Sequence, residues 1–144
     1  MMKAVQTGIA TRQKGLTLIE LMVVVAVISI LASVAIPLYT EQVQKSRRAD
    51  GRVALTTIAA AQERFFTLNG RYTATLGSLS IDTDLQGGDS EAGFYNLAVN
   101  ATTTSFTVTA TPDSTTAQAG DDCTLMRLNS VGVKDGTGSG CWQN

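Results

Sequence analysis

The sequence contains no histidine and, in 144 residues, only two prolines, two cysteines and one tryptophan. Without histidine, a histidine-based catalytic triad, a histidine general base and histidine-containing zinc sites are excluded. The chain also lacks a G-x-S-x-G nucleophile motif and a phosphate-binding P-loop. We therefore predict a protein that is not an enzyme and that carries no cofactor.

One short segment has a metal-binding pattern that is incomplete. Residues 82–87, D-T-D-L-Q-G, are similar to the start of a calcium-binding loop, with glycine at the sixth position. The twelfth position of such a loop would be Gly93, where a bidentate glutamate normally stands. We predict a solvated acidic loop here and no metal site.

Charge is absent between Leu21 and Thr40, and these twenty residues are mostly apolar. Twenty helical residues extend about 30 Å, which matches the hydrocarbon core of a bilayer. The residues before this segment carry basic side chains and no acidic one until Glu20. A carboxylate at the edge of an apolar segment needs a partner, because drawing it towards the membrane centre is unfavourable.

Three interpretations of this N-terminal region compete. It could be a secretory signal peptide, with a small-x-small site at residues 33–35. However, the apolar run exceeds the usual 7–15 residues of such peptides and has a carboxylate near its start. It could also be an ordinary single-pass anchor whose basic N-terminus stays in the cytoplasm.

The third interpretation is a resemblance. Residues 15–37, G-L-T-L-I-E-L-M-V-V-V-A-V-I-S-I-L-A-S-V-A-I-P, resemble the N-terminus of type IV pilins and of type II secretion pseudopilins, with their class III N-methylation signal. Glu20 and Pro37 both fall where this family has them. Two positions depart from the pattern: Leu16 stands where most pilins have phenylalanine, and Ser29 where many have glycine.

The resemblance implies specific processing and assembly residues. A prepilin peptidase, which is also the methyltransferase, would cut between Gly15 and Leu16, and Leu16 would become the N-methylated terminus. Glu20 would serve in assembly, and Pro37 would mark the family's helix bend. Partners would then be other pilin subunits, the peptidase, the inner membrane and the pilus assembly machinery. The protein would move from the bacterial inner membrane to an extracellular pilus.

We expect three parts along the chain: a leader at 1–15, the membrane and assembly half of a helix at 16–43, and an extracytoplasmic head at 44–144. The leader contains Lys3, Arg12 and Lys14, so the remaining eight basic and twelve acidic side chains give a net charge of −4. That mild acidity suits a soluble extracellular surface and provides no general attraction for nucleic acid.

The head has a helical pattern followed by strand patterns. The helix should extend to about residue 69, with an apolar stripe formed by Val43, Ala54, Ile58, Ala61, Phe65 and Leu68. A second apolar line, Leu55, Ala59 and Phe66, could be scattered surface residues or a contact with neighbouring helices.

A polar connecting loop is expected at 70–93, with a short helical turn near 76–79. Alternating apolar and polar residues predict strands at 94–99, 105–110 and 123–128, and a short fourth strand at 131–134. No helices intervene between the strands, so the sheet should be antiparallel and should pack on the helix. The expected fold class is α+β.

Both cysteines, Cys123 and Cys141, lie beyond the apolar segment, where disulfides form. We predict a disulfide that closes a floppy loop containing D-G-T-G-S-G. A redox or metal pair is the alternative, but C-x-x-C spacing is lacking. The tail C-T-L-M-R-L-N-S-V-G-V-K-D-G…G-C-W, with R-R-A-D, Q-E-R-F-F and N-G-R-Y, resembles minor pilins of the PilE type.

These observations predict a structural subunit, most similar to a minor pilin, of a type IV pilus. The alternatives are a type II secretion pseudopilin and a pilus-tip adhesin or DNA-binding subunit. The basic cluster Lys45, Arg47, Arg48 and Arg52 lies just beyond the apolar segment, where it would meet lipid headgroups or acidic partners. Nucleic acid is therefore not expected as a partner, although the sequence does not exclude it.

Overall fold

The computed structural model describes residues 15–143, which divide into one unit that ends at Pro37 and another that begins at Leu38. The longest element is helix α1 (Leu18–Asn69). The remaining elements, in chain order, are η1 (Leu76–Ser78), α2 (Thr83–Gly87), β1 (Tyr95–Ala101), β2 (Phe106–Pro112), β3 (Leu125–Asn129) and β4 (Lys134–Thr137). The expected α+β class is confirmed.

The first unit consists of the N-terminal part of α1 and the three residues before it. Gly15, Leu16 and Thr17 are not helical, and α1 begins at Leu18. The Thr17 hydroxyl oxygen accepts a hydrogen bond from the Glu20 amide at 3.3 Å, which caps the helix start. The predicted helix therefore exists, but it starts two residues later than residue 16. It continues without interruption through Pro37.

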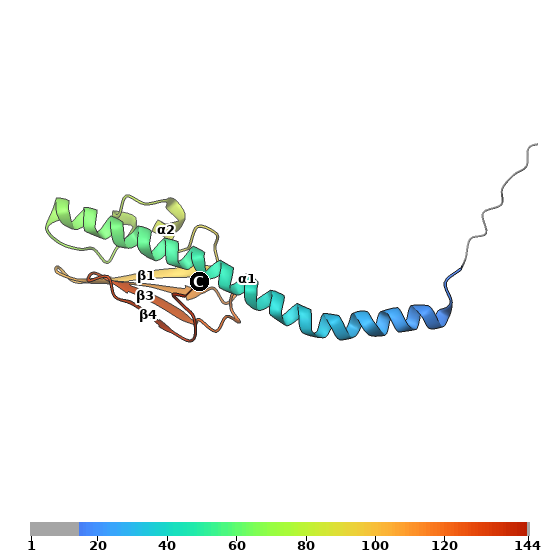
Figure 1. Ribbon diagram of the computed structural model, residues 1–144. Helices are drawn as coiled ribbons and strands as arrows, with labels where there is room; N and C mark the ends of the chain where they lie inside the picture. The colour runs from blue at the N-terminus through green and yellow to red at the C-terminus, as the bar shows by residue number, and fades with distance from the viewer. Residues whose placement is uncertain (1–14, 144) are drawn as a thin grey trace, which may run out of the picture. The chain divides into compact units, whose positions relative to one another are not determined.

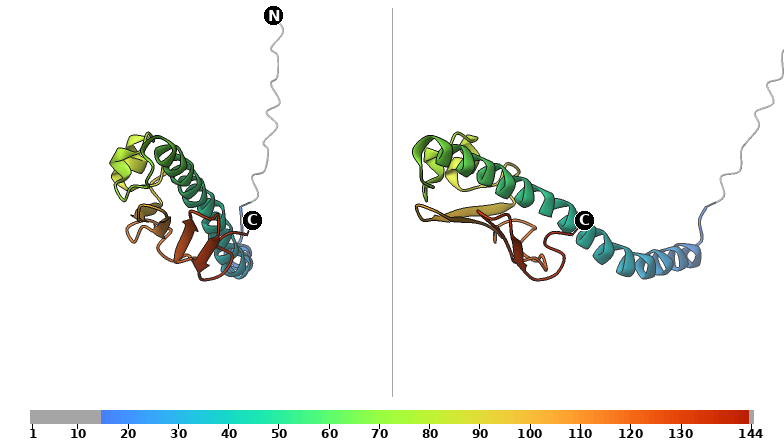
Figure 2. Two further views of the ribbon diagram at one scale, coloured as in Figure 1. Left: turned by 90° about the vertical axis from the view of Figure 1, so that its left-hand side faces the viewer. Right: turned by 60° about the vertical axis from the view of Figure 1, so that its left-hand side comes forward.

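In the second unit, α1 lies along one face of a four-stranded sheet (Figures 1 and 2). The part of the chain that connects α1 to β1 lies beside the helix. The buried face of α1 does not coincide with the predicted stripe. Ala54, Ile58 and Ala61 are buried as expected, whereas Leu68 is 84% exposed. The residues of α1 that are buried are Arg48, Gly51, Ala54, Leu55, Ile58, Ala61 and Gln62.

The prediction of a second apolar line through Leu55, Ala59 and Phe66, separate from the first, is wrong. Leu55 has no exposed area and belongs to the core of its own head, and Ala59 packs against that core. Phe66 stacks on Tyr72 with ring centroids 4.6 Å apart. Because Leu55 lies only about 60° around the helix from Ile58, the two expected lines are parts of one buried face.

The sheet is an antiparallel meander in the order β1-β2-β3-β4. Its inner face supplies apolar side chains at alternate positions, as expected for a sheet with one face in the core and one face exposed to solvent. These inward residues are Tyr95 and Leu97 on β1, Phe106, Val108 and Ala110 on β2, and Met126 and Leu128 on β3. The first three predicted strands are confirmed, with ends shifted by one or two residues.

The fourth strand begins later than predicted. Residues 131–133 form the turn between β3 and β4, and the pairing begins only at Lys134. The Asn129 side-chain oxygen accepts hydrogen bonds from the amides of Val131 and Val133, at 3.1 and 2.9 Å. Gly132 has a φ of 80°, which a strand does not allow and a turn does. The two valines favour a strand in the sequence, but asparagine and glycine impose a turn.

The connection at 70–93 is more structured than a loop. The predicted helical turn is confirmed as η1, but residues 83–87 form α2, which the sequence pattern did not indicate. Gly88 ends α2 in the left-handed conformation, with a φ of 94°. The buried Gln62 side chain fixes the start of the connection, since it donates to the Thr73 carbonyl at 2.6 Å and accepts from the Thr73 amide at 3.1 Å.

We predict that Gly51→Val destabilises the head by about 1–3 kcal/mol, as overpacking of a core does. A Cβ at position 51 would lie 2.5 Å from the Met126 methyl carbon and 3.1 Å from the Tyr95 ring, and both side chains are buried. Denaturant unfolding of the two variants would measure the effect. Gly77→Val is the control, because a Cβ there meets nothing within 4 Å; equal losses in both variants would contradict the prediction.

Candidate functional site

The predicted processing and assembly residues lie close together at the start of the described chain. Gly15 and Leu16 are exposed and precede α1, and Glu20 lies exposed in its first turn. An accessible peptide bond outside a helix, such as that between residues 15 and 16, is the form that a protease requires. The rest of the expected leader, residues 1–14, lies outside the described residues.

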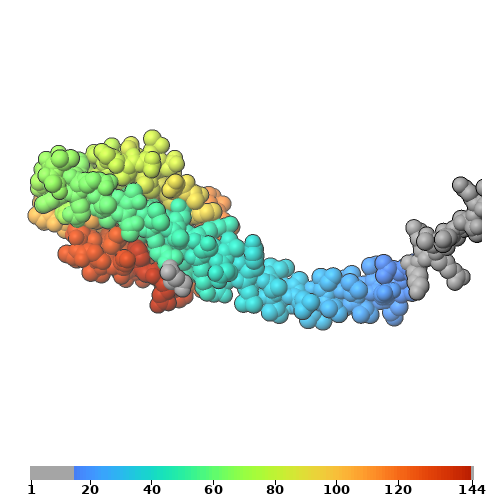
Figure 3. All heavy atoms as spheres, turned by 45° about the horizontal axis from the view of Figure 1, so that its top comes forward, coloured from blue at the N-terminus to red at the C-terminus, as the bar shows by residue number. Residues whose placement is uncertain are grey.

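The first unit presents an uncovered apolar surface. The 18-residue window of highest hydropathy in α1 has a mean hydropathy of 2.8 and no buried residue, and α1 is long and apolar enough to cross a membrane. Figure 3 shows this segment as an open run of blue spheres. Its serines bond within the helix, Ser29 to the Val25 carbonyl and Ser33 to the Ile30 carbonyl, both at 2.7 Å. The hydroxyls are therefore compatible with an apolar solvent.

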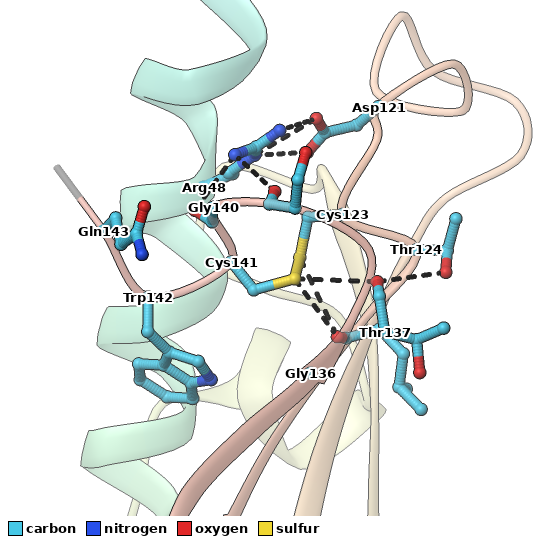
Figure 4. The surroundings of a disulfide bond; sticks show 12 residues. Arg48, Asp121, Cys123, Thr124, Gly136, Thr137, Gly140, Cys141, Trp142 and Gln143 are labelled. Carbon is cyan, nitrogen blue, oxygen red and sulfur yellow. Dashed lines mark hydrogen bonds and ion pairs between the residues drawn. A yellow bond between two sulfur atoms is a disulfide. The ribbon is translucent and has the colours of Figure 1, made fainter.

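In the second unit, Cys123 and Cys141 form the predicted disulfide, with Cα atoms 5.2 Å apart. It ties the segment before β3 to the segment after β4 (Figure 4). Both cysteines are buried. With both sulfurs in this bond, neither cysteine is a free thiolate for a metal, and residues 15–143 contain no group of three or more metal-ligating side chains.

The loop that the disulfide closes is not floppy. A Cβ on Gly136 would lie 2.8 Å from the Cys141 sulfur, and one on Gly138 would lie 1.7 Å from the Asp122 carbonyl oxygen. Gly138 also has a φ of 103°. The glycines suggest flexibility in the sequence, but in the structure they permit close backbone approach. Trp142 adds a further contact, since its indole N–H donates to the Asp135 carbonyl at 2.8 Å.

Arg48 joins this loop to α1. Its guanidinium is buried and bonds both oxygens of the buried Asp121 carboxylate, with Nε 2.8 Å from Oδ2. Nη1 also donates to the carbonyl oxygens of Ser139 and Gly140, at 3.1 and 2.9 Å. One side chain of the helix therefore holds the chain on both sides of the disulfide, as Figure 4 shows. We call Arg48, Asp121 and these two carbonyls the Arg48 clasp.

Two further buried polar side chains support the clasp. The Gln118 amide donates to Asp121 Oδ2 at 2.7 Å and lies 2.9 Å from the Tyr95 hydroxyl. Burial raises the pKa of Asp121, but hydrogen bonds and positive charge from Arg48, with help from Gln118, outweigh that effect and leave the pKa below its usual value. Burial, together with the Asp121 charge, raises the pKa of Tyr95 to about 12. At neutral pH the carboxylate is charged and the phenol is not.

The basic cluster expected to meet lipid headgroups or partner acids is largely engaged within the head. Arg48 is in the clasp, and Lys45 pairs with Glu41 at 2.5 Å. Arg47 lies over the Phe94 ring, 4.6 Å from its centroid. Arg52 donates to the Gln143 carbonyl at 3.3 Å. Lys45, Arg48 and Arg52 follow one side of α1, where the two arginines bond the C-terminal segment, whereas Arg47 points to Phe94.

Sequence reasoning missed the clasp because it followed apolar residues alone. Arg48, Gly51, Leu55, Ile58 and Gln62 recur at alternating spacings of three and four, the spacing of one helix face. All five are buried. The polar residues that share this spacing, Arg48 and Gln62, are the signal that could have indicated it.

Two families match the chain. The family described as "Type IV minor pilin ComP, DNA uptake sequence receptor" matches residues 37–127, and the prokaryotic N-terminal methylation motif matches residues 10–36. Together they cover both the apolar segment and most of the head.

Individual proteins show the same similarity. The type IV major pilin PilA of Myxococcus xanthus is 42% identical over 62 residues, which are 43% of this chain and only 28% of PilA. The fimbrial protein EcpC of Eikenella corrodens is 32% identical over 103 residues, 72% of this chain and 65% of EcpC. The crystal structure of the non-core minor pilin PilV of Neisseria meningitidis shares the fold, with a TM-score of 0.53 and 21% identity over 69% of this chain and 91% of PilV.

We predict that Arg48→Met lowers the free energy of unfolding by about 3–5 kcal/mol, since it leaves Asp121 buried without its cation. Arg127→Met is the matched control: it removes a pair with Asp135 whose side chains are 40% and 60% exposed, and should cost about 0–1 kcal/mol. Denaturant unfolding with the disulfide intact would measure both. A loss no larger than that of the control would contradict the prediction.

The same pair predicts a pH dependence. Because the pKa of Asp121 is lowered in the folded state, its contribution is complete above the ordinary value of 3.8 and is lost as the pH falls through the lower, folded value. The difference between the parent and Arg48→Met should therefore shrink as the pH falls and Asp121 becomes protonated, first in the variant, where burial is no longer opposed by Arg48, and then in the parent. A constant difference down to the acid unfolding of the parent would show that the charge of Asp121 is not what Arg48 stabilises.

Proposed function

Since this chain belongs to the family of the type IV minor pilin ComP, we propose that it is cut between Gly15 and Leu16, held in the inner membrane by α1 and assembled into a pilus. Leu16 would become the methylated terminus, and a prepilin peptidase and the pilus assembly machinery would be its partners. Residues 1–15 would act as the leader, 16–43 as the membrane and assembly half of the helix, and 44–144 as the head. The chain would have a structural role.

The uncovered apolar part of α1 is the observation that carries this proposal. The side chains of residues 18–36 that are large and apolar are about half exposed or more. At about 25 cal/mol per Å² such a surface is unfavourable in water. Lipid can cover it before assembly, and the helices of other subunits can cover it in a filament.

Glu20 has a specific role in this scheme. After the cut, the Leu16 amine would be a positive charge four residues before Glu20, just ahead of the start of α1 at Leu18. Pairing within one chain at such spacing contributes only about 0.3–0.5 kcal/mol. Between packed helices, where little water remains, an unpaired carboxylate is much more costly. We therefore propose that Glu20 pairs with the Leu16 amine of the neighbouring subunit and sets the register of assembly.

A pilus is favoured over a type II secretion pseudopilus. The ComP family matches residues 37–127, which include most of the head, and the head is the part in which pilins differ from pseudopilins. The head is also closed by a C-terminal disulfide. The apolar segment alone would not separate the two, because pilins and pseudopilins share that pattern.

DNA binding is a second candidate function, and the family description favours it, against the expectation from net charge. The surface offers one suitable region. Arg64 and Arg71 are exposed near the end of α1, and no acidic residue occurs between Arg64 and Ile81. Phosphate contacts made by such arginines would supply sequence-independent affinity.

We predict that Glu20→Gln leaves membrane insertion, cleavage at Gly15 and head folding intact but lowers incorporation into sheared filaments by about tenfold, the effect of about 1.4 kcal/mol. Quantitative immunoblots of sheared filaments and of membranes would measure incorporation, and intact mass would verify the cut. Glu91→Gln, at an exposed position in the head, is the control. If the Glu20 variant enters filaments as well as the control does, the pairing role is wrong.

For DNA, we predict that the full chain in detergent binds duplex DNA with an affinity whose logarithm falls linearly with the logarithm of salt concentration. Arg71→Gln should weaken binding and reduce the salt slope by about 1, as loss of one phosphate contact does. Arg127→Gln is the control, because that arginine already pairs with Asp135. Absence of binding at low salt would remove DNA from the candidate partners.

A further inference from the structure

The end of the head that follows the apolar segment carries a shallow groove of about 250 Å³. Its walls are α1 on one side and the β2–β3 connection on the other. We call it the proximal groove; its lining residues are Tyr39, Thr40, Val43, Gln44, Arg47 and Ala117. Tyr39 is 71% exposed, although its aromatic ring is large and apolar.

Hydrogen bonds hold the wall opposite the helix in place. The Gln44 amide donates to the Ala117 carbonyl at 3.4 Å, and the Gln118 amide donates back to the Gln44 carbonyl at 3.2 Å. Gln118 is itself fully buried beside the clasp. These bonds hold the β2–β3 connection against α1, so this connection does not fold over Tyr39.

Among its lining residues, Arg47 alone is charged. Glu41 lies about 200° around the helix from Tyr39 and is paired with Lys45. Two other carboxylates of this region are engaged: Asp50 accepts from the Ser90 hydroxyl and the Ala92 amide, and Asp113 accepts from the Thr115 amide and hydroxyl. The connection from Ser114 to Gly120 contains no charge. The groove therefore combines the side chains of Tyr39, Val43 and Ala117 with one cation, Arg47, whose guanidinium lies over the Phe94 ring and keeps its N–H groups for a phosphate.

We propose that the proximal groove docks on the lipid headgroup layer while the protein waits in the membrane, with Tyr39 and Val43 at the acyl boundary and Arg47 on lipid phosphate. This inference rests on the proposed membrane-held state. It assigns the lipid contact to one defined surface of the head, in which Arg47 supplies the charge, and not to the basic cluster as a whole.

Chain length favours lipid as the occupant. The interfacial layer on each side of a bilayer is about 5–7 Å thick, which corresponds to about four helical residues. Thr40 is the last residue of the uncharged segment, so Tyr39 falls at the edge of the hydrocarbon core and Val43 in the layer just beyond it. Tyrosine is enriched there, and arginine extends its charge towards phosphate while its stem stays in apolar surroundings. A polar protein partner would not need a tyrosine and a valine at this place.

The test uses the full chain, with Trp142→Phe as background and a single tryptophan introduced at one of three positions. Vesicles contain phosphatidylethanolamine and phosphatidylglycerol, with bromine atoms near the top of the acyl chains as fluorescence quencher. Ala117→Trp, the groove reporter, probes the proximal groove, and Leu31→Trp, the anchor reporter, probes the apolar segment. Thr103→Trp is the distal reporter in the β1–β2 turn, where the Thr103 carbonyl accepts from the Tyr72 amide beyond the end of α1.

We expect the bromolipid to quench the groove and anchor reporters and to leave the distal reporter bright. Arg47→Gln should reduce the quenching of the groove reporter and Arg47→Lys should preserve most of it. Arg127→Gln, which removes an arginine that pairs with Asp135 on the sheet, should change nothing. If the anchor reporter is quenched but the groove reporter is as bright as the distal one, the docking proposal is wrong while membrane anchoring stands. If the anchor reporter is not quenched either, the anchoring itself fails.

A second copy of the chain is the competing occupant, and the same samples identify it. Another chain covers the groove if the groove reporter is protected from the aqueous quencher acrylamide without bromolipid quenching, and if that protection increases with the protein-to-lipid ratio. That result would overturn the lipid proposal. Mass spectrometry without reductant would verify that each variant retains the Cys123–Cys141 disulfide, so that misfolded material is not scored.

Discussion

The contact between α1 and the inner face of the sheet is the constraint on which the head depends. Four short strands in a meander bury little surface by themselves and are stable only when a second layer covers their apolar face. Leu55 and Ile58 supply that cover and have no exposed area, and Val108 and Met126 of the sheet have none either. The helix in turn cannot be covered on all sides, and its remaining faces are left for other molecules.

Polar residues fix how this two-layer contact is aligned. Apolar side chains alone tolerate sliding of a helix along a sheet, whereas a buried ion pair is satisfied in only one position. Arg48 must meet Asp121 and two carbonyls, and Gln62, further along the buried face, must meet both backbone groups of Thr73. The Arg48 contacts align α1 with the segments that flank the sheet, and the Gln62 contacts fix the connection that leaves α1, because any shift strands a buried polar group.

Much of the fold could be predicted from sequence because its signals are local. The uncharged run, the alternation in the first three strands and the position of two cysteines beyond the apolar segment each depend on neighbouring residues. The fourth strand failed on a local signal, the turn that Asn129 and Gly132 impose, but the clasp and the glycine loop depended on residues far apart in the chain. Arg48 and Asp121 are 73 residues apart, so the helix spacing around Arg48 can indicate that this side chain is buried but cannot identify its partner. Likewise the glycines at 136 and 138 look flexible in the sequence, and only the Cys141 and Asp122 atoms beside them show why a side chain is not allowed.

The closely packed glycine loop has a practical consequence for imaging. Fluorescent tags, epitopes and cross-linkable residues are commonly inserted near a chain's C-terminus. Here, a side chain added at Gly136, Gly138 or Gly140 would press on the disulfide, on the Asp122 backbone or on the Arg48 guanidinium. The β1–β2 turn at Thr102–Ser105 has exposed side chains instead. Labels meant to follow this subunit in living cells belong in that turn.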